Sequence, residues 1–401
     1  MRKNIKLLAL FNFFTDFQLY SAILVIYFAK ITGSYMLAMS LFSVAMISLA
    51  VFEVPTGIFS DYIGRKRTMV LGAVSAVLSV SFYAIGSGYL ILFIGALLEG
   101  LQRAWYSGNN DALLYETLAE TGKKDDYDHY LGRTSSMFQL AAAVGIIIGG
   151  VIAVWSMHLI MWLSVIPQLI CLRISFLIKE PVKKTNQSSN IYFHLKTAFL
   201  KIWNNRKLRL LSFNQIIGFA IGESTYQFRA AFVNTLWPIW AVGFSKVLSS
   251  IGAAISYWYS AKLIKRVGPF RLLLISNIYG KFINIFSVTI VSVLSPVLLS
   301  TTSLFFGATS VANSKLMQKE FTDDQRATLG SVNSLLGNLA FGLFAMGLGF
   351  SADKFGPAKA LLAAYIFSLP TILVNWKLFT QRSISPSYSD VGRSDKGNSR
   401  V

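Results

Sequence analysis

The sequence is poor in cysteine, histidine and charge, and each shortage narrows the class of protein. Cys171 is the single cysteine among 401 residues, which excludes an internal disulfide and a multi-cysteine metal site. The three histidines lie far apart in the sequence and form no metal-binding pattern. Charged residues make up 14% of the chain, against about 25% in a soluble globular domain. We therefore expect neither a metal centre nor the fold of a water-soluble globular protein.

The chain also lacks the motifs of an enzyme or of an ATP-driven pump. It has no GxxxxGK[ST] loop for binding phosphates and no polar stretch long enough for a separate ATP-binding domain. No nucleophile, base and acid occur together in a recognisable pattern. The sequence therefore predicts a protein that is not an enzyme and that needs no cofactor.

Long apolar runs, by contrast, recur along the whole chain. Hydrophobic residues make up 54% and aromatic residues 14% of the sequence, and the mean hydropathy is +0.54. The runs are continuous and of the length that crosses a bilayer as a helix, whereas barrel strands would alternate over short segments. The first run is too long for a cleavable signal and lacks a small-residue cleavage site. The fold class we predict is an all-α polytopic membrane protein.

Twelve apolar stretches are predicted to span the membrane, in two pseudo-symmetric halves of six helices. The stretches are 7–29, 36–59, 69–87, 89–107, 135–155, 158–178, 209–235, 242–263, 270–293, 296–316, 328–350 and 358–379. The predicted domains are an N-terminal half (1–178), a central cytoplasmic loop (179–208) with an amphipathic helix over 191–205, a C-terminal half (209–379) and a disordered cytoplasmic tail (380–401).

The distribution of cations fixes the predicted orientation. With both termini in the cytoplasm, the cytoplasmic segments hold 30 of the 37 lysine and arginine residues. The predicted external loops hold four of them, namely Lys30, Lys246, Lys354 and Lys359. Because cytoplasmic loops of membrane proteins are enriched in cations, this asymmetry supports the topology and places the protein in the cell membrane. It also explains the net charge of +19 without a nucleic-acid partner.

The two halves carry matching features at a nearly constant offset. Phe11-Asn12 corresponds to Phe213-Asn214, 202 residues later, and Gly64 corresponds to Gly268, 204 residues later. Both glycines close short basic turns between predicted spans. Duplicated halves of this kind are typical of secondary transporters.

A short basic turn separates the second and third predicted spans. It reads Gly57-Ile-Phe-Ser-Asp61-Tyr-Ile-Gly64-Arg65-Lys66-Arg67. With two six-span halves and a central cytoplasmic loop, this turn resembles the loop signature of the major facilitator superfamily. Residues 106–133 resemble a bacterial subgroup of permeases and efflux proteins within it. The resemblance covers nearly the whole chain and implies a transporter that works as a monomer by alternating access.

The resemblance also implies a gating role for the turn. Gly57, Asp61, Gly64, Arg65, Lys66 and Arg67, joined by Arg103, would form a cytoplasmic latch. Asp61 would contact the start of the eleventh span near Thr328-Leu-Gly330. The alternative is a basic anchor with a capping Asp61. The spacing recurs externally as Gly349-xxx-Asp353-xx-Gly356 without the cations, so we interpret the bare spacing as common turn chemistry.

Ionisable groups inside predicted spans are the candidate substrate and proton sites, because such groups are costly to bury in a membrane. Asn12, Asp16 and Tyr20 recur every fourth residue and predict one polar stripe on the first span, facing a central cavity. Glu223, Tyr226 and Gln227 form the second candidate group, on the seventh span. The alternative for both acids is a structural salt bridge, for instance with Arg229 or Lys281. Glu99 and Arg103 are expected to pair, being four residues apart.

These observations predict a secondary transporter that moves a small molecule by alternating access. Proton-coupled export is the first hypothesis, with protons, lipid and a small-molecule substrate as the partners. Proton-coupled uptake of a nutrient is the alternative. A non-transporting membrane receptor on the same fold is the alternative of another class.

Overall fold

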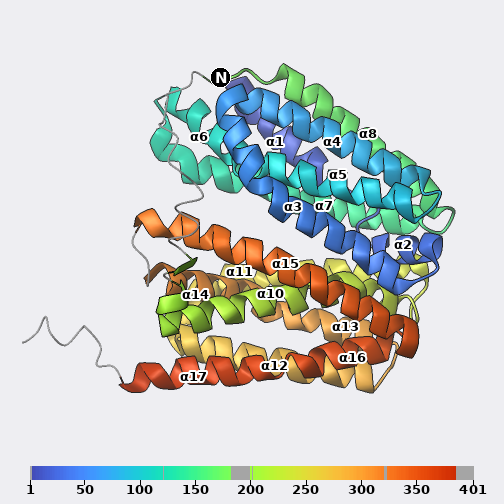
Figure 1. Cartoon of the computed structure of the whole chain (residues 1–401), viewed down its shortest axis with the longest axis vertical. Helices are drawn as coiled ribbons and strands as arrows, with labels where there is room; N and C mark the ends of the chain where they lie inside the picture. The colour runs from blue at the N-terminus through green and yellow to red at the C-terminus, as the bar shows by residue number, and fades with distance from the viewer. Residues whose placement is uncertain (1, 121, 182–198, 201, 320–322, 385–401) are drawn as a thin grey trace, which may run out of the picture.

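The computed structural model describes residues 2–120, 122–181, 199–200, 202–319 and 323–384, and this part of the chain contains helices and no strand. The helices gather in two bundles (Figure 1). The first bundle comprises α1 (Arg2–Asp16), α2 (Leu24–Thr32), α3 (Tyr35–Ile63), α4 (Arg65–Ile85), α5 (Tyr89–Tyr106), α6 (Asn109–Glu120), α7 (Tyr127–Ile152) and α8 (Met157–Leu177). The second comprises α10 (Arg206–Val233), α11 (Ile239–Val267), α12 (Pro269–Thr289), α13 (Ser295–Thr301), α14 (Phe306–Lys319), α15 (Asp323–Phe355), α16 (Pro357–Phe367) and α17 (Pro370–Ile384).

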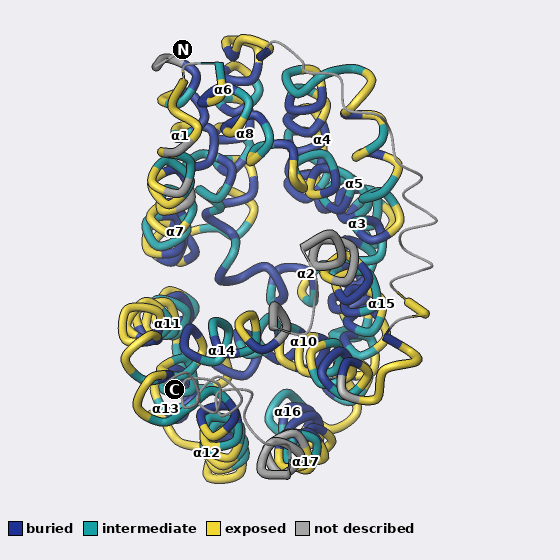
Figure 2. Tube along the Cα trace, turned by 90° about the vertical axis from the view of Figure 1, so that its left-hand side faces the viewer, coloured by how far each residue is buried: buried dark blue, intermediate teal, exposed yellow. Residues whose placement is uncertain are grey.

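Nine stretches within the described residues are long and apolar enough to cross a membrane. Helix also occupies the other three predicted spans, 7–29, 89–107 and 209–235, but the first is interrupted and α5 and α10 carry polar side chains. Figure 2 shows exposed residues on the outer faces of α11, α12 and α17, as expected for helices that face lipid. The count of twelve spans stays a prediction. The predicted amphipathic helix and the predicted tail lie largely outside the described residues.

The first predicted span is not one continuous helix. α1 ends at Asp16, and the chain runs without helix through residues 17–23 before α2 begins at Leu24. The carbonyl groups freed by this break accept hydrogen bonds from distant side chains. Gln168 of α8 donates to Thr15 O at 3.4 Å, and Lys246 of α11 donates to Ser21 O at 2.5 Å. Helix breaks are tolerated at membrane depth when the freed backbone groups are satisfied in this way.

Glycines of α7 let the backbone of this break approach closely. A Cβ at Gly149 would collide with the carbonyl oxygen of Leu19, and a Cβ at Gly145 would lie 3.3 Å from the backbone of Gln18. On the same helix, a Cβ at Gly150 would lie 2.9 Å from Trp240 O, at the start of α11. These glycines therefore permit close packing of α7 against the break and against α11.

The two bundles meet along α3 with α15 and along α7 with α11. In the first pair, the buried Ser43, two turns after the start of α3, donates a 2.7 Å hydrogen bond to Gly342 O. We name the two ends of this pair after their acidic residues. The Asp61 end holds the basic turn between α3 and α4, and the Asp353 end holds the last turn of α15.

Candidate functional site

A cavity of about 100 Å³ lies between the two bundles. The break between α1 and α2, together with α3 and α5, forms the wall from the first bundle, and α10, α11 and α15 form the wall from the second. The lining residues are Gln18, Tyr20, Ser21, Leu24, Phe42, Ala45, Met46, Glu99, Arg103, Gln227, Lys246 and Phe341. A site shared by both halves and bordered by a discontinuous helix is where transporters of this architecture bind substrate.

One wall of the cavity carries a self-contained ion pair. Arg103 Nη2 donates to Glu99 Oε1 at 2.6 Å, and Tyr83 OH donates to Glu99 Oε2 at 2.7 Å. The predicted pairing of Glu99 with Arg103 is confirmed. Arg103 therefore lies at the cavity and not in the cluster around the basic turn, where the sequence had placed it. Arg103 lies one turn after Glu99 on α5, and side chains at this spacing on a helix are close enough to pair.

The opposite wall carries a cation that the sequence analysis misplaced. Lys246 was assigned to an external loop, but it lies within α11, whose first residue is Ile239. Besides donating to Ser21 O, its ammonium lies 5.4 Å from the ring centroid of Tyr226. Lys246 lies close to the predicted start of the eighth span. At such a position the sequence does not distinguish a cation in a loop from a cation that lines a cavity.

The three residues of the predicted first-span stripe lie in different surroundings. Asn12 is buried in α1, and its Nδ2 donates to Thr134 O at 3.4 Å. Asp16 is half-buried at the end of α1, and Tyr20 is buried in the break, where it lines the cavity and meets Tyr83 edge-on. The prediction of one helical stripe is wrong, because four-residue periodicity aligns side chains only while the helix continues.

The candidate group on α10 stays together. Gln227 lines the cavity, and its Nε2 donates to Glu223 Oε1 at 2.7 Å. Tyr226 faces the ammonium of Lys246. Among the described residues, Glu223 makes no salt bridge with a lysine or an arginine. The structural pairing considered as the alternative is therefore not formed.

Arg229 and Lys281, the cations considered as salt-bridge partners of Glu223, make hydrogen bonds with other residues of the second bundle. Arg229 donates to Asn284 Oδ1 at 2.9 Å and to Tyr365 OH at 3.1 Å. Lys281 donates to Ser368 Oγ at 2.5 Å. Neither side chain lines the cavity between the bundles, and both make hydrogen bonds within the second bundle.

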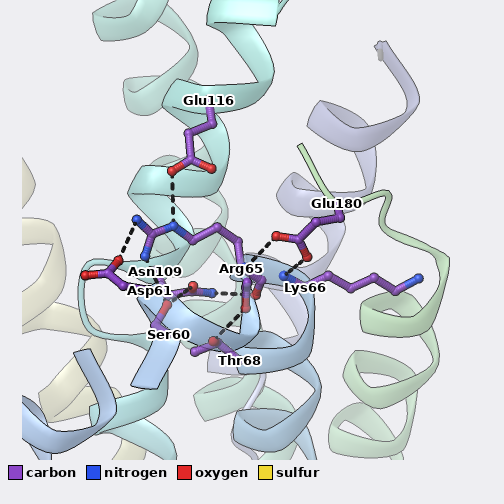
Figure 3. Close-up of polar contacts among 9 residues, drawn as sticks. Ser60, Asp61, Arg65, Lys66, Thr68, Asn109, Glu116 and Glu180 are labelled. Atoms are coloured by element: carbon purple, nitrogen blue, oxygen red, sulfur yellow. Dashed lines mark hydrogen bonds and ion pairs between the residues drawn. The ribbon is translucent and has the colours of Figure 1, made fainter. Parts of the chain in front are cut away.

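The basic turn forms a polar cluster inside the first bundle (Figure 3). Arg65 is its centre: its guanidinium lies 3.1 Å from Glu116 of α6, 3.0 Å from Ser60 Oγ and 3.3 Å from Asp61. Glu180, which follows α8, accepts hydrogen bonds from the backbone N–H groups of Arg65 at 2.6 Å and Lys66 at 2.8 Å. A carboxylate at the N-terminal turn of α4 interacts favourably with the helix dipole and stabilises the helix.

Gly64 is required by this arrangement. Its φ of +92° is strained for any residue with a side chain, and a Cβ there would lie 2.7 Å from the Glu180 carboxylate. Gly57, in contrast, has no atom within 4 Å of a Cβ position, and Arg67 is exposed. Asp61 is exposed and pairs with Arg65 of its own bundle. The predicted contact with Thr328-Leu-Gly330 stays a prediction: the side chain of Thr328 lies outside the described residues, and Gly330 is exposed.

The Asp353 end joins the two bundles directly. The carboxylate of Asp353 accepts hydrogen bonds from Ser34 Oγ at 2.5 Å, Tyr35 N at 2.6 Å and Met36 N at 3.0 Å, all at the start of α3. A Cβ at Gly349 would collide with Tyr35 O, so this glycine permits the approach. The interpretation of Gly349-xxx-Asp353 as common turn chemistry is therefore wrong, because Asp353 caps a helix of the other bundle and does not cap its own turn.

Solved structures with the same arrangement are membrane transporters. The chain superposes on the nucleoside transporter NupG with a TM-score of 0.80 at 14% identity, over 94% of this chain and 99% of that one. It superposes on a POT family transporter in complex with 5-aminolevulinic acid with a TM-score of 0.71 at 13% identity, over 94% and 95% of the two chains. At these identities the likeness shows the fold alone.

Sequence comparison gives the family. The model of the Major Facilitator Superfamily matches residues 7–345, so the chain belongs to this family and is a transporter, not an enzyme. It is 21% identical over 338 residues to the uncharacterized MFS-type transporter MJ1560 of Methanocaldococcus jannaschii, covering 82% of this chain and 86% of that protein. It is 25% identical over 122 residues to the class E tetracycline resistance protein of Escherichia coli, a match that spans 30% of this chain and 28% of that protein.

Proposed function

We propose that this transporter moves a small molecule across the cell membrane by alternating access, coupled to protons and in the direction of export. The observation that carries the proposal is the central cavity, which both bundles line and which Tyr20, Arg103 and Gln227 border. In this proposal the bundles are the two pseudo-symmetric halves. The Asp61 end faces the cytoplasm with both termini, as the cation distribution indicates.

The proposed proton carriers are Asp16 and Glu223. Both are half-buried acids near the cavity, and neither makes a salt bridge among the described residues. A carboxyl group that is exposed alternately to two compartments can take up a proton on one side and release it on the other. Asp16 lies where α1 ends, so a change in the conformation of the break would change the access of the Asp16 carboxyl group to water.

Export is supported by the partial similarity to a tetracycline resistance protein and by the apolar side of the cavity. Uptake is the second candidate, and Lys246 is the observation that favours it. Arg229 and Lys281 do not line this cavity. Lys246 and Arg103 instead supply positive charge at the cavity itself.

Substituting the proposed proton carriers tests the coupling. The Asp16→Asn and Glu223→Gln variants keep the size of the side chain but cannot carry the proton. We expect at least one of them to lower flux driven by a pH gradient by about tenfold or more, which corresponds to about 1.4 kcal/mol. The measurement is uptake or release by vesicles containing the purified protein, using a compound first identified by its effect on thermal stability.

Asp111→Asn is the matched control, because Asp111 is an exposed carboxylate of α6 outside the cavity. This control should keep the wild-type rate. Full gradient-driven flux in both the Asp16→Asn and the Glu223→Gln variants would show that the proton assignment is wrong.

The proposed gating role of Asp61 predicts a conformational effect. The Asp61→Asn variant should favour the conformation in which the Asp61 end is open. Since Asp61 is exposed, we expect a change in the population ratio of roughly threefold, within the range of about 0–1 kcal/mol for exposed ion pairs. Spin labels at the exposed positions Tyr62 and Lys265 would report it as a larger fraction of long distances.

Asp353→Asn, made in the same labelled background, should move the two populations in the opposite direction. If Asp61→Asn leaves the distance distribution unchanged, the basic turn is an anchor and not a latch.

A further inference from the structure

The ammonium of Lys246 has no carboxylate within ion-pair distance in the described part of the chain. Among the described residues, no acid lies within 4.0 Å of its ammonium, which contacts Ser21 O and the ring of Tyr226. A backbone carbonyl and an aromatic face supply only partial negative charge. An ammonium in such surroundings is costly unless an anion approaches it.

Neither Glu99 nor Glu223 forms an ion pair with Lys246. Glu99 is held by Arg103 and by Tyr83. Glu223 accepts from Gln227 and lies beyond ion-pair distance of Lys246. The residues that line the cavity therefore include one carboxylate, which is paired with Arg103, and Lys246 has no ion-pair partner among them.

The remaining lining has two chemically different parts. The amide groups of Gln18 and Gln227 already donate to Thr15 O and to Glu223, and each has a second N–H that can donate to a ligand. Apolar side chains form the other part, namely Leu24, Phe42, Ala45, Met46 and Phe341. A ligand that matches both parts has an anionic head and an apolar or aromatic body.

We propose that this cavity binds a small amphiphilic monoanion, with its carboxylate on Lys246 and its apolar body against Phe42, Met46 and Phe341. This inference rests on the proposed transport function and adds the chemical class of the substrate. A cationic substrate would be repelled by Lys246. The ammonium of a zwitterion would have to compete with Arg103 for Glu99, and the geometry favours a plain anion for this reason.

Three probes of similar size and different charge test the proposal: benzoate, benzamide and benzylamine. Benzoate should raise the thermal unfolding temperature of the purified protein in a concentration-dependent manner, because a ligand that binds the folded state stabilises it. Benzamide and benzylamine should have much smaller effects. Equal stabilisation by benzamide and benzoate, or no stabilisation by benzoate, would overturn the inference, and this comparison needs only the wild-type protein.

Variants locate the effect at Lys246. In Lys246→Gln the half-saturating benzoate concentration should rise at least fivefold, whereas Lys246→Arg should keep it within about twofold because the charge remains. Lys262→Gln is the matched control, because Lys262 is exposed on the same helix and does not line the cavity. Unchanged benzoate binding in Lys246→Gln would overturn the assignment.

The two proposals fail in different ways. Benzoate binding that depends on Lys246, without flux in any pH gradient, would uphold this inference and refute proton-coupled transport. Gradient-driven flux of neutral or cationic compounds that persists in Lys246→Gln would refute this inference and uphold proton-coupled transport.

Discussion

The Asp353→Ala variant is expected to separate α15 from α3 at the Asp353 end and to favour the conformation that opens there. The carboxylate of Asp353 accepts three hydrogen bonds from the first residues of α3, where the helix dipole also favours an anion. Because the site is exposed, we assign the whole contact about 1–3 kcal/mol. That free energy changes the ratio of the two conformations by about 5- to 150-fold.

Distances between spin labels at Leu90 and Lys359 would measure this change. Both residues are exposed, and they belong to different bundles. Ser351→Ala is the matched control, because Ser351 is also in the last turns of α15 but donates within its own helix, to Gly347 O. A distribution that is the same in wild type, Ser351→Ala and Asp353→Ala would show that Asp353 does not hold the bundles together.

The Gly149→Ala variant is expected to destabilise the protein by about 1–3 kcal/mol or more, because one added methyl group overpacks a filled site. A Cβ at this position would collide with the carbonyl oxygen of Leu19, and a backbone atom cannot move aside as a flexible side chain can. The break between α1 and α2 would have to shift. Tyr20 and Ser21, which line the cavity, would move with it.

Thermal unfolding and transport rate would both report the effect of Gly149→Ala. Gly132→Ala is the matched control, since Gly132 lies on the same helix and has no atom within 4 Å of a Cβ position. Gly132→Ala should keep or raise the unfolding temperature, because alanine favours helix more than glycine does. If Gly149→Ala behaves like Gly132→Ala, the close approach of the break to α7 contributes nothing to stability.

The sequence was sufficient to place most of the helices, because runs of apolar residues and short basic turns report local structure directly. It could not predict the break after Asp16. The segment from Phe17 to Ile23 contains no glycine or proline, and the side chains that satisfy its freed carbonyls, Gln168 and Lys246, lie far away in the chain. Only the glycines of α7 gave an indirect signal, since they mark a place where another backbone approaches.

The contacts of two residues between the bundles were missed for the same reason. From the sequence, Lys246 was interpreted as a cation near the end of a span, and Asp353 as an acid in a turn. Their roles arise from partners in the other bundle, Ser21 and the start of α3, which no local pattern specifies. By contrast, the pairing of Glu99 with Arg103 depends only on helical spacing, and it was predicted correctly.

The hydrogen bond from Ser43 to Gly342 divides α3 into two arms of unequal length. From Ser43 to Tyr35 the helix extends about 12 Å, and from Ser43 to Asp61 it extends about 27 Å, at a rise of about 1.5 Å per residue. If α3 tilts as a rigid rod about this contact, its Asp61 end travels about twice as far as its Asp353 end. The small separation that breaks the hydrogen bonds of Asp353 would thus be amplified at the opposite end of the same helix.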